Sequence, residues 1–205
     1  MSGRTYDRVK RMLDTVASAA GLLATAPLQL GVALTVALRL GRPVLFRQLR
    51  PGRDGELFEL VKFRTMTPID TQRGLVTDAD RLTPFGRRLR ATSLDELPTL
   101  WNVLVGDMSF VGPRPLLPEY LSLYSPDQAR RHEVRPGITG LAQVAGRNHV
   151  EWADRLALDI AYVSARSPRL DARILWQTLR VVLTREGISG AGEATMAPFR
   201  GAAEP

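Results

Sequence analysis

Two adjacent carboxylates, Asp95 and Glu96, are the residues of this chain best suited to chemistry. They lie in the segment 93–98, and basic residues flank them, with Arg90 upstream and Arg114 downstream between two prolines. Carboxylates that meet arginines at the start of a helix suit phosphate chemistry with a metal ion, because guanidinium groups bind phosphate oxygens and carboxylates bind the metal. The pair therefore indicates a site for a phosphorylated substrate.

The neighbouring residues also predict the local geometry of this pair. Ser93 and Glu96 have the spacing of a capping box, with Ser93 as the N-cap. That register would put Pro98 at the fifth position of the helix, where its ring clashes with the carbonyl of Leu94. A cap at Asp95 puts Pro98 in the first turn, so we expect a helix over 96–104 with Gly106 as its C-cap. The helix dipole would keep Asp95 ionised, and an ionised aspartate can attack phosphorus. The alternative is that Asp95 only caps the helix and Glu96 is only a first-turn charge.

The composition bounds the class of protein. The 205 residues allow one domain with a sizeable core, and the net charge is +7 with a pI of about 10.6. A basic excess implies an acidic partner, which can be nucleic acid, anionic lipid or a phosphorylated substrate. The chain has no cysteine, which excludes disulfides, zinc thiolate sites and cysteine nucleophiles. His132 and His149 are too few and too dispersed for a histidine-rich metal site.

An uncharged apolar segment runs from Thr15 to Leu38 and is long enough to span a bilayer. Pro27 lies near its middle, where it should break or kink a helix. Basic residues flank both ends, although the positive-inside rule keeps such residues on the cytoplasmic side. A helix that enters one leaflet, breaks at Pro27 and returns satisfies both flanks, and Thr25 and Gln29 can bond the opened backbone. We therefore expect a re-entrant hairpin, and a simple span is the alternative.

The rest of the chain predicts an α+β fold with a small β-hairpin and several short or amphipathic helices. The hairpin is expected from two β-type runs, 43–48 and 57–63, which a turn separates. The segment 67–84 is polar and turn-rich and is expected to be a loop. Further expected elements are helical turns over 118–132 broken at Ser125-Pro126, a turn over 135–140, a strand over 141–144, and helices over 150–165 and 170–185.

The last of these helices has apolar residues on one side and arginines on the other. Its apolar side fits two roles: packing into the core, or lying on a lipid surface, where Trp152 and Trp176 would suit the headgroup layer. The residues from 191 onward are rich in glycine, alanine and proline, which predicts a loosely ordered tail.

With these motifs in order, the chain resembles the bacterial sugar transferases of the small monotopic phosphoglycosyl transferase family, from about residue 10 to residue 200. Six or more separate motifs make the resemblance specific, whereas the Asp-Glu pair alone would not. One departure is Ala26 before Pro27, where many members have a serine that could bond the opened backbone. The motifs are Lys10-Arg11-x-x-Asp14, Pro43-Val-Leu-Phe-Arg47-Gln48, Lys62-Phe63-Arg64-Thr65-Met66, Ser93-Leu-Asp-Glu-Leu-Pro98, Gly106-Asp-Met-Ser-Phe-Val-Gly-Pro-Arg-Pro115, Pro136-Gly-Ile-Thr-Gly140, Gly146-Arg147-Asn148 and Leu170-Asp171.

The resemblance implies that a sugar 1-phosphate passes from a UDP-sugar to polyprenyl (undecaprenyl) phosphate, with Mg²⁺ as cofactor, giving polyprenyl-diphospho-sugar and UMP. It implies that Asp95 is the nucleophile and carries a covalent phosphosugar, that Glu96 is the second catalytic carboxylate, and that both contact the metal. The substrate-binding residues that it implies are Lys62, Arg64, Arg90, Arg114, Arg147 and Asp171. Lys62 and Arg64 could equally be plain surface charges, and Asp171 could be an N-cap or an ion-pair partner on the last helix.

The resemblance further implies a location at the cytoplasmic face of the bacterial inner membrane, with membrane lipid as a partner and no nucleic acid. It divides the chain into a membrane segment over 1–40, a catalytic domain over 41–190 and a tail over 191–205. A homodimer is compatible with the sequence, which indicates no interface. Two alternative functions are a membrane-tethered nucleic-acid-binding protein and a non-catalytic scaffold. The low aromatic content argues against the first, and the intact Asp-Glu pair argues against the second. The tail is similar to that of small enzymes using modified N-acetyl amino sugars such as diacetylated bacillosamine.

Overall fold

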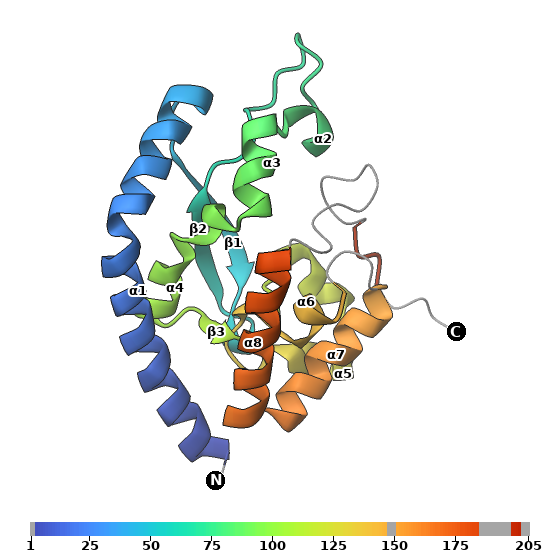
Figure 1. The fold of residues 1–205 in the computed structure, drawn as a ribbon. Coiled ribbons are helices and arrows are strands. Elements are labelled where there is room, and N and C mark those ends of the chain that lie inside the picture. Colours follow the sequence, from blue (N-terminus) through green and yellow to red (C-terminus); the bar gives the residue numbers. More distant parts are fainter. Residues whose placement is uncertain (1–2, 147–150, 185–197, 202–205) are drawn as a thin grey trace.

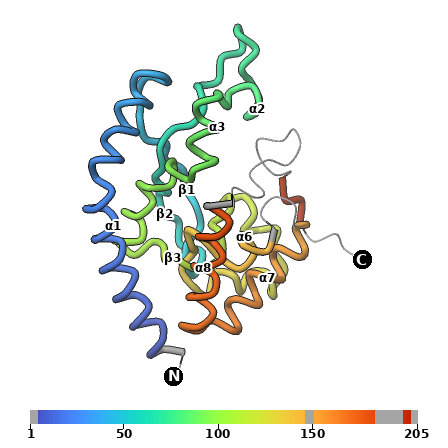
Figure 2. Tube along the Cα trace, viewed as in Figure 1, coloured from blue at the N-terminus to red at the C-terminus, as the bar shows by residue number. Residues whose placement is uncertain are grey.

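The computed structural model describes residues 3–146, 151–184 and 198–201 (Figure 1). One long helix, α1 (Gly3–Leu40), lies along one side of a body made of short helices and two small sheets. The β1–β2 hairpin, α3 and α4 lie on the concave side of this bowed helix (Figures 1 and 2). The expectation of a mixed fold with a small sheet and an apolar N-terminal helix is therefore confirmed.

The expected break of this helix at Pro27 is not confirmed, because α1 continues through that residue. The Oγ1 of Thr25 donates to the carbonyl of Gly21 at 2.6 Å, and the Nε2 of Gln29 donates to the Oγ1 of Thr25 at 2.9 Å. These bonds lie beside the proline, but neither reaches the carbonyl of Leu23, which Pro27 leaves without its helical donor, so the expected bonding of an opened backbone is not confirmed. They accompany a continuous, bowed helix rather than an opened two-helix hairpin (Figure 2).

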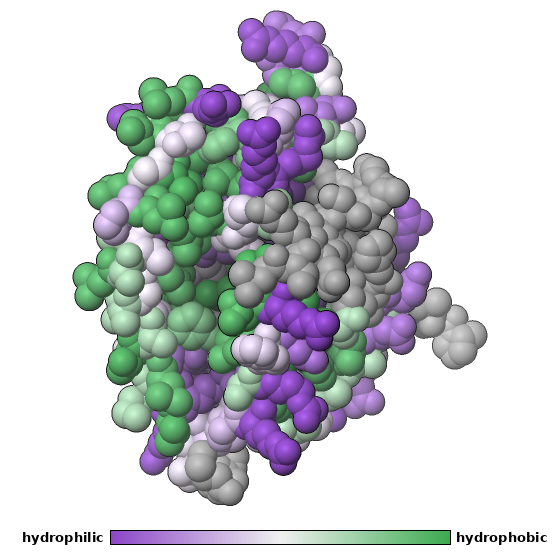
Figure 3. All heavy atoms as spheres, viewed as in Figure 1, coloured by the Kyte–Doolittle hydropathy of each residue, from purple (hydrophilic) through white to green (hydrophobic). Residues whose placement is uncertain are grey.

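Several polar side chains of α1 lie against the protein and many of its apolar side chains point outward, although Val32 and Val36 pack into the core. Asp14 and Ser18 are 5 % and 0 % exposed, whereas Leu23 and Leu38 are 79 % and 78 % exposed. A helix packed on a protein in water has the opposite arrangement. Apolar side chains gather along α1 in the space-filling view (Figure 3), and among the described helices α1 alone is long and apolar enough to cross a membrane. The outward face therefore has the chemistry of a surface that meets lipid.

The expected hairpin is confirmed by β1 (Leu45–Pro51) and β2 (Leu57–Phe63), which pair antiparallel around the 3₁₀ turn η1 (Arg53–Gly55). Strand β2 is the inner strand: Phe63 packs against Val36 of α1. Phe58 and Leu60 pack against Val103 of α4. The hairpin therefore packs against both α1 and α4, and these two helices also contact each other, because Arg11 donates to the carbonyls of Val103 and Leu104.

Four short helical elements come next: α2 (Asp78–Arg81), α3 (Pro84–Ala91), η2 (Leu94–Glu96) and α4 (Thr99–Val105). Thr83 caps α3 by accepting a hydrogen bond from the backbone of Gly86 at 3.0 Å. Helix α2 lies inside the segment expected to be a loop, because Thr77 and Asp80 form a capping box there. That expectation is corrected to a loop interrupted by one helical turn.

The helix after the carboxylate pair begins later than expected. Asp95 is not its N-cap but lies inside the 3₁₀ turn η2, and α4 starts only after Pro98. Leu94 and Leu97 on either side of the carboxylates pack into the core cluster with α1 and β2, which favours a tight turn at this point. The expected C-cap is confirmed, since Gly106 adopts a left-handed φ of 105°.

The second sheet pairs β3 (Ser109–Val111) with β4 (Gly137–Thr139) in parallel, through the connecting turns η3 (Pro118–Leu123), α5 (Pro126–Ala129) and η4 (Arg130–Glu133). The expected break is confirmed, because Ser125 caps α5 together with Gln128. The strand expected over 141–144 is wrong, since α6 (Leu141–Gly146) occupies it. Leu141 and Val144 both pack in the cluster around Ile174, and a short apolar run does not distinguish helix from strand.

Helices α7 (Trp152–Ala165) and α8 (Pro168–Thr184) confirm the last two expected helices. Of the two roles left open by the sequence, core packing is confirmed for part of α8, and contact with a lipid surface stays a prediction. Leu170 and Ile174 pack into the core beside Tyr162, whereas Leu175 and Trp176 are exposed. The side of α8 that faces away from the core is therefore mixed, because Arg173 and Arg180 are exposed beside these apolar residues.

The aromatic residue at the start of α7 is a core residue. Trp152 packs against Tyr120 and Phe199 with ring centroids 5.7 Å and 5.2 Å away, so it does not serve a headgroup layer. Phe199 belongs to the expected loose tail, of which the structure describes only residues 198–201. The remainder of that prediction lies outside the described residues.

Candidate active site

The carboxylate pair sits on a turn that the core holds from both sides. Ser93 enters η2 in the left-handed conformation with φ 55°, and Leu94 and Leu97 are anchored in the core. Between these anchors Asp95 is only 6 % exposed, and Glu96 follows it. A turn fixed in this way gives both carboxylates defined positions.

Three cations surround the two carboxylates, and together we call these residues the site cluster (Lys62, Arg90, Asp95, Glu96 and Arg114). The Nη2 of Arg114 donates to the Oε1 of Glu96 at 3.1 Å, and the Nζ of Lys62 lies 3.6 Å from the same oxygen. Asp95 forms no hydrogen bond or ion pair with any other described residue, although the charges of Lys62, Arg90 and Arg114 act on it. Glu96 is thus held in place by two cations, whereas no such contact from a described residue holds the carboxylate of Asp95.

The two carboxylates also differ in acidity. Burial raises the pKa of Asp95, and the adjacent Glu96 raises it further, against the opposing effect of the three cations. Burial acts on Glu96 in the same direction, but Arg114 and Lys62 outweigh it and hold the pKa of Glu96 below its usual value. The expectation that a helix dipole keeps Asp95 ionised is corrected, because Asp95 caps no helix and its charged form depends on the neighbouring cations.

Two side chains of α4 hydrogen-bond to the backbone of β2, the strand that carries Lys62, and so fix the carboxylate pair relative to that lysine. The Oγ1 of Thr99 donates to the carbonyl of Val61 at 2.9 Å, and the Oδ1 of Asn102 accepts from the N–H of Val61 at 3.1 Å. The Nδ2 of Asn102 donates to the carbonyl of Glu59 at 2.8 Å. Both side chains are buried, so these bonds fix the distance between the helix and the strand. The sequence interpretation missed both residues, although buried polar side chains at i and i+3 of an apolar helix were a signal.

Arg90 reaches the site because α3 approaches the chain after β2 very closely. A Cβ on Gly86 would lie 1.9 Å from the carbonyl oxygen of Thr65, so only glycine allows this approach. The Nε of Arg90 then donates to the Oγ1 of Thr65 at 3.1 Å. This contact orients the guanidinium group of Arg90, whose charge acts on Asp95.

Arg64 does not join the site cluster. Its guanidinium group donates to the carbonyls of Leu40, Gly41 and Arg42, with the bond to Gly41 at 2.5 Å and that to Arg42 at 3.4 Å. Leu40 is the last residue of α1, and its carbonyl has no helical partner; Gly41 and Arg42 follow directly, and a cation at this end also favours the helix dipole. The contacts of Arg64 in this structure are therefore those of a structural residue, which ties the end of α1 to β2.

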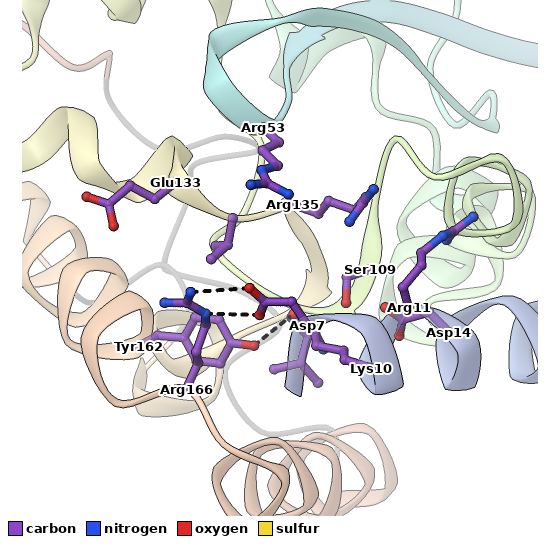
Figure 4. Close-up of a pocket in the computed structure, with 12 residues that line it drawn as sticks. Asp7, Lys10, Arg11, Asp14, Arg53, Ser109, Glu133, Arg135, Tyr162 and Arg166 are labelled. Carbon is purple, nitrogen blue, oxygen red and sulfur yellow. Dashed lines mark hydrogen bonds and ion pairs between the residues drawn. The ribbon is translucent and has the colours of Figure 1, made fainter. Parts of the chain in front are cut away.

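Asp171 does not join the site cluster either. It belongs to a second group of charges, which we call the joint cluster (Asp7, Lys10, Tyr162, Arg166 and Asp171) and which connects α1 to α7 and α8. Asp171 accepts from Lys10 at 2.5 Å and from the hydroxyl of Tyr162 at 2.9 Å. Arg166 donates to Asp7 at 3.2 Å beside a small cavity (Figure 4). The open alternative for Asp171, an ion pair on the last helix, is what the structure describes, while Arg147 lies outside the described residues.

The carboxylates present fit a magnesium ion. Mg²⁺ commonly takes one or two carboxylates and completes its octahedral shell with water and substrate phosphates. Within the ranges that the structure describes, no group of three or more ligating side chains occurs, so Asp95 and Glu96 would be the protein ligands. Such a site depends on phosphate oxygens of a substrate for most of its remaining ligands.

Comparison with known proteins agrees with the geometry of the site. Residues 5–185 match the family model described as bacterial sugar transferase. The chain therefore belongs to the bacterial sugar transferase family. The expected class of enzyme, a phosphoglycosyl transferase, is confirmed by this membership and by the relatives' descriptions.

Several bacterial relatives are similar over most of the chain. An uncharacterized sugar transferase, EpsL, of Bacillus subtilis (strain 168) is 48% identical over 197 residues, which cover 96% of this chain and 98% of the relative. A UDP-glucose:undecaprenyl-phosphate glucose-1-phosphate transferase of Caulobacter vibrioides is 44% identical over 88% of this chain and 72% of its own length. An undecaprenyl-phosphate galactose phosphotransferase of Salmonella typhimurium is 38% identical over 91% of this chain, but the match covers only 43% of that protein.

Proposed function

We propose that this enzyme transfers a sugar 1-phosphate from a UDP-sugar to polyprenyl (undecaprenyl) phosphate, with Asp95 as the nucleophile. The observation that carries the proposal is the environment of Asp95, a buried carboxylate with no bond to another described residue beside three cations. A nucleophile must be free to reach its target, and cations must be available to bind a diphosphate. The names of the Caulobacter and Salmonella relatives support undecaprenyl phosphate as the acceptor.

The proposed reaction has two steps at one phosphorus atom. In the first step a carboxylate oxygen of Asp95 attacks the phosphorus that carries the sugar, the phosphoanhydride bond breaks, and UMP leaves with the electron pair. In the second step a phosphate oxygen of the polyprenyl phosphate attacks the same phosphorus and releases the carboxylate of Asp95. The products are UMP and polyprenyl-diphospho-sugar, and a single small site serves both substrates in turn.

The remaining residues of the site cluster have supporting roles in this proposal. Arg114 and Arg90 bind phosphate oxygens, since a guanidinium group matches two oxygens at once. Lys62 balances the charge of the diphosphate, and Glu96 orients Lys62 and Arg114 through the contacts described above. Bound Mg²⁺, held by Asp95 and Glu96, would neutralise the diphosphate so that an anionic carboxylate can approach phosphorus.

We also propose that α1 enters the inner membrane from the cytoplasmic face and returns to the same side. Its outward face is apolar, which supports contact with lipid. Both of its ends bond to one and the same protein body: Lys10 pairs with Asp171, and Arg64 caps the carbonyls of Leu40 and Gly41. A spanning helix would carry its ends to opposite faces of the bilayer, where one domain could not hold both. A shallow insertion would keep the site at the height of the headgroups, where a soluble donor meets a lipid acceptor.

Intact-protein mass spectrometry tests the covalent step. The detergent-solubilised enzyme is incubated with Mg²⁺ and single donors, including UDP-glucose, UDP-galactose and UDP-linked N-acetyl amino sugars, without acceptor. We expect a mass increase equal to one sugar phosphate with the correct donor, absent in Asp95→Asn. An adduct in Asp95→Asn, or turnover without any adduct in the wild type, would contradict the role of Asp95.

The topology has a separate test, which the absence of cysteine makes simple. Single cysteines are introduced near Arg4 and near Arg42, and intact spheroplasts are treated with a membrane-impermeant thiol reagent. We expect neither position to react until the membrane is opened. Reaction at one end alone would establish a spanning helix instead.

A further inference from the structure

The segment Pro113–Pro115, which carries Arg114, is held by its carbonyl oxygens. Two of its three residues are prolines and have no N–H to donate, so its carbonyls are the main anchor points. The N–H of Gly137 donates to the first carbonyl at 2.9 Å, Arg131 donates to the second at 2.6 Å, and Arg50 donates to the third at 3.5 Å. The shortest of these bonds is made by Arg131 and reaches the backbone of Arg114 itself.

Arg131 is itself held by a buried ion pair. Its Nε and Nη2 donate to the Oδ2 of Asp159 at 3.1 Å and 2.8 Å, and both side chains are 2 % exposed. Its Nη1 lies 3.4 Å from the hydroxyl oxygen of Tyr124, to which it donates. All three nitrogens of the guanidinium group are therefore engaged, which leaves the side chain one orientation.

A buried ion pair is a weak explanation of stability. The cost of removing two charges from water roughly cancels their attraction, and well-packed apolar residues often replace such a pair without loss. An apolar pair could replace neither the bond from Nη2 to the carbonyl of Arg114 nor the longer bond from Nη1 to Tyr124, and only the first leads to the site cluster. Arg114 in turn donates to Glu96 at 3.1 Å. A chain of direct contacts thus runs from Asp159 through Arg131 and Arg114 to Glu96.

We propose that Arg131 and Asp159 are a positioning pair, which fixes the backbone of Arg114 so that its guanidinium group meets Glu96 and the phosphates of the substrate. This inference rests on the proposed role of Arg114 in phosphate binding. Arg131 touches neither carboxylate of the site cluster and therefore acts only through Arg114. The neighbouring pair Arg130 and Glu133 has the same chemistry at 3.0 Å but is solvent-exposed, and it provides a matched control.

The first test replaces both charges of the pair, so that neither is left buried without a partner. We expect Arg131→Met/Asp159→Leu to fold with a melting temperature close to that of the wild type, yet to lose roughly 10- to 100-fold in kcat/KM, as small displacements of a binding group do. The control Arg130→Met/Glu133→Leu should keep full activity. If the double variant does not fold, Arg131→Lys is measured in its place, because it keeps the charge opposite Asp159 but not the planar three-nitrogen contact.

The second test asks whether the effect passes through Arg114. In an Arg114→Ala background the same replacement should change kcat/KM by less than about 2-fold, since residues that act through one another are not additive. The same 10- to 100-fold loss in both backgrounds, or an activity loss equal to the loss of folded protein, would overturn the inference and leave the proposed function intact. Full activity of Arg114→Ala alone would overturn the proposed role of Arg114 and the inference with it.

Discussion

The site cluster and the joint cluster are both groups of partly buried charge, but they distribute that charge differently. In the joint cluster each cation has its own anion: Lys10 pairs with Asp171 and Arg166 pairs with Asp7. In the site cluster three cations face two carboxylates, and Asp95 bonds to none of them. Paired charges stabilise a contact between elements, whereas a desolvated, unbonded carboxylate beside several cations is the arrangement that the proposed reaction with an anionic substrate needs.

The largest effect is expected at the unbonded carboxylate. Asp95→Asn should reduce transfer by more than about 10³-fold, as loss of a nucleophile does. Its thermal stability should stay the same or rise, because burial and Glu96 disfavour the charged form that the substitution removes. Transfer rates and thermal unfolding, measured on the same preparation, check both parts. Near-normal transfer would remove Asp95 from the reaction.

The next largest effect is expected from removing one cation, Arg114, from the site cluster. Arg114→Ala should lower kcat by about 10²- to 10³-fold, the usual cost of losing one donor to a developing charge. Arg130→Ala, which breaks an exposed pair outside both clusters, is the control and should leave kcat unchanged. Equal activity of the two variants would mean that the cation surplus has no role in catalysis.

Substitutions in the joint cluster should lower the stability of the fold rather than the rate of catalysis. Asp171→Asn leaves Lys10 without its partner in a partly buried position and should lower the free energy of unfolding by roughly 3 kcal/mol. Activity should fall only with the amount of folded protein. The double variant Lys10→Met/Asp171→Leu, which removes both charges, should recover part of that stability. A variant that is fully stable yet inactive would return Asp171 to the substrate site, as the resemblance implied.

A smaller effect comes from His132, which lies outside both clusters and bonds through Nδ1 to the carbonyl of Gly52 at 3.1 Å. Burial, with Arg131 beside it, lowers the pKa of His132 to about 4. The unfolded chain, with a histidine pKa of about 6.5, therefore binds the proton first as pH falls, and stability present above pH 6.5 is lost toward pH 4, by about 2 kcal/mol at pH 5. Denaturant unfolding at pH 7 and pH 5 should differ less in His132→Gln than in the wild type. An equal pH dependence in both proteins would exclude His132 as its source.

The sequence was informative wherever a local pattern carries the signal. It identified the Asp-Glu pair, the hairpin, the break before Pro126 and the helices α7 and α8, because turn residues and apolar periodicity act over a few positions. It misjudged the register of α4 and the strand over 141–144, because in both cases packing of a short apolar segment decided between turn, helix and strand. Helix α1 also continues through Pro27, where the sequence predicted a break; the proline is exposed, and the hydrogen bonds of Thr25 and Gln29 beside it are made within the helix.

The roles of individual charges were beyond the reach of the sequence. Asp171 lies 161 positions from its partner Lys10, and Arg64 lies 24 positions from the carbonyl of Leu40 that it caps. An acidic or basic residue looks the same in a sequence whether it meets a substrate or a distant ion-pair partner. For the same reason nothing local marked Arg131 as a support of Arg114.

By itself, then, the sequence determined the class of enzyme, the long apolar N-terminal helix and most of the local elements, since these depend on residue types at fixed spacing. Only the tertiary structure decided which charges meet. It separated the site cluster from the joint cluster, left Asp95 unbonded and tied Glu96 to Lys62 and Arg114. The physical reason is that electrostatic and hydrogen-bonding partners are set by distances in space, and these exist only once α1, β2, α4 and α8 have packed.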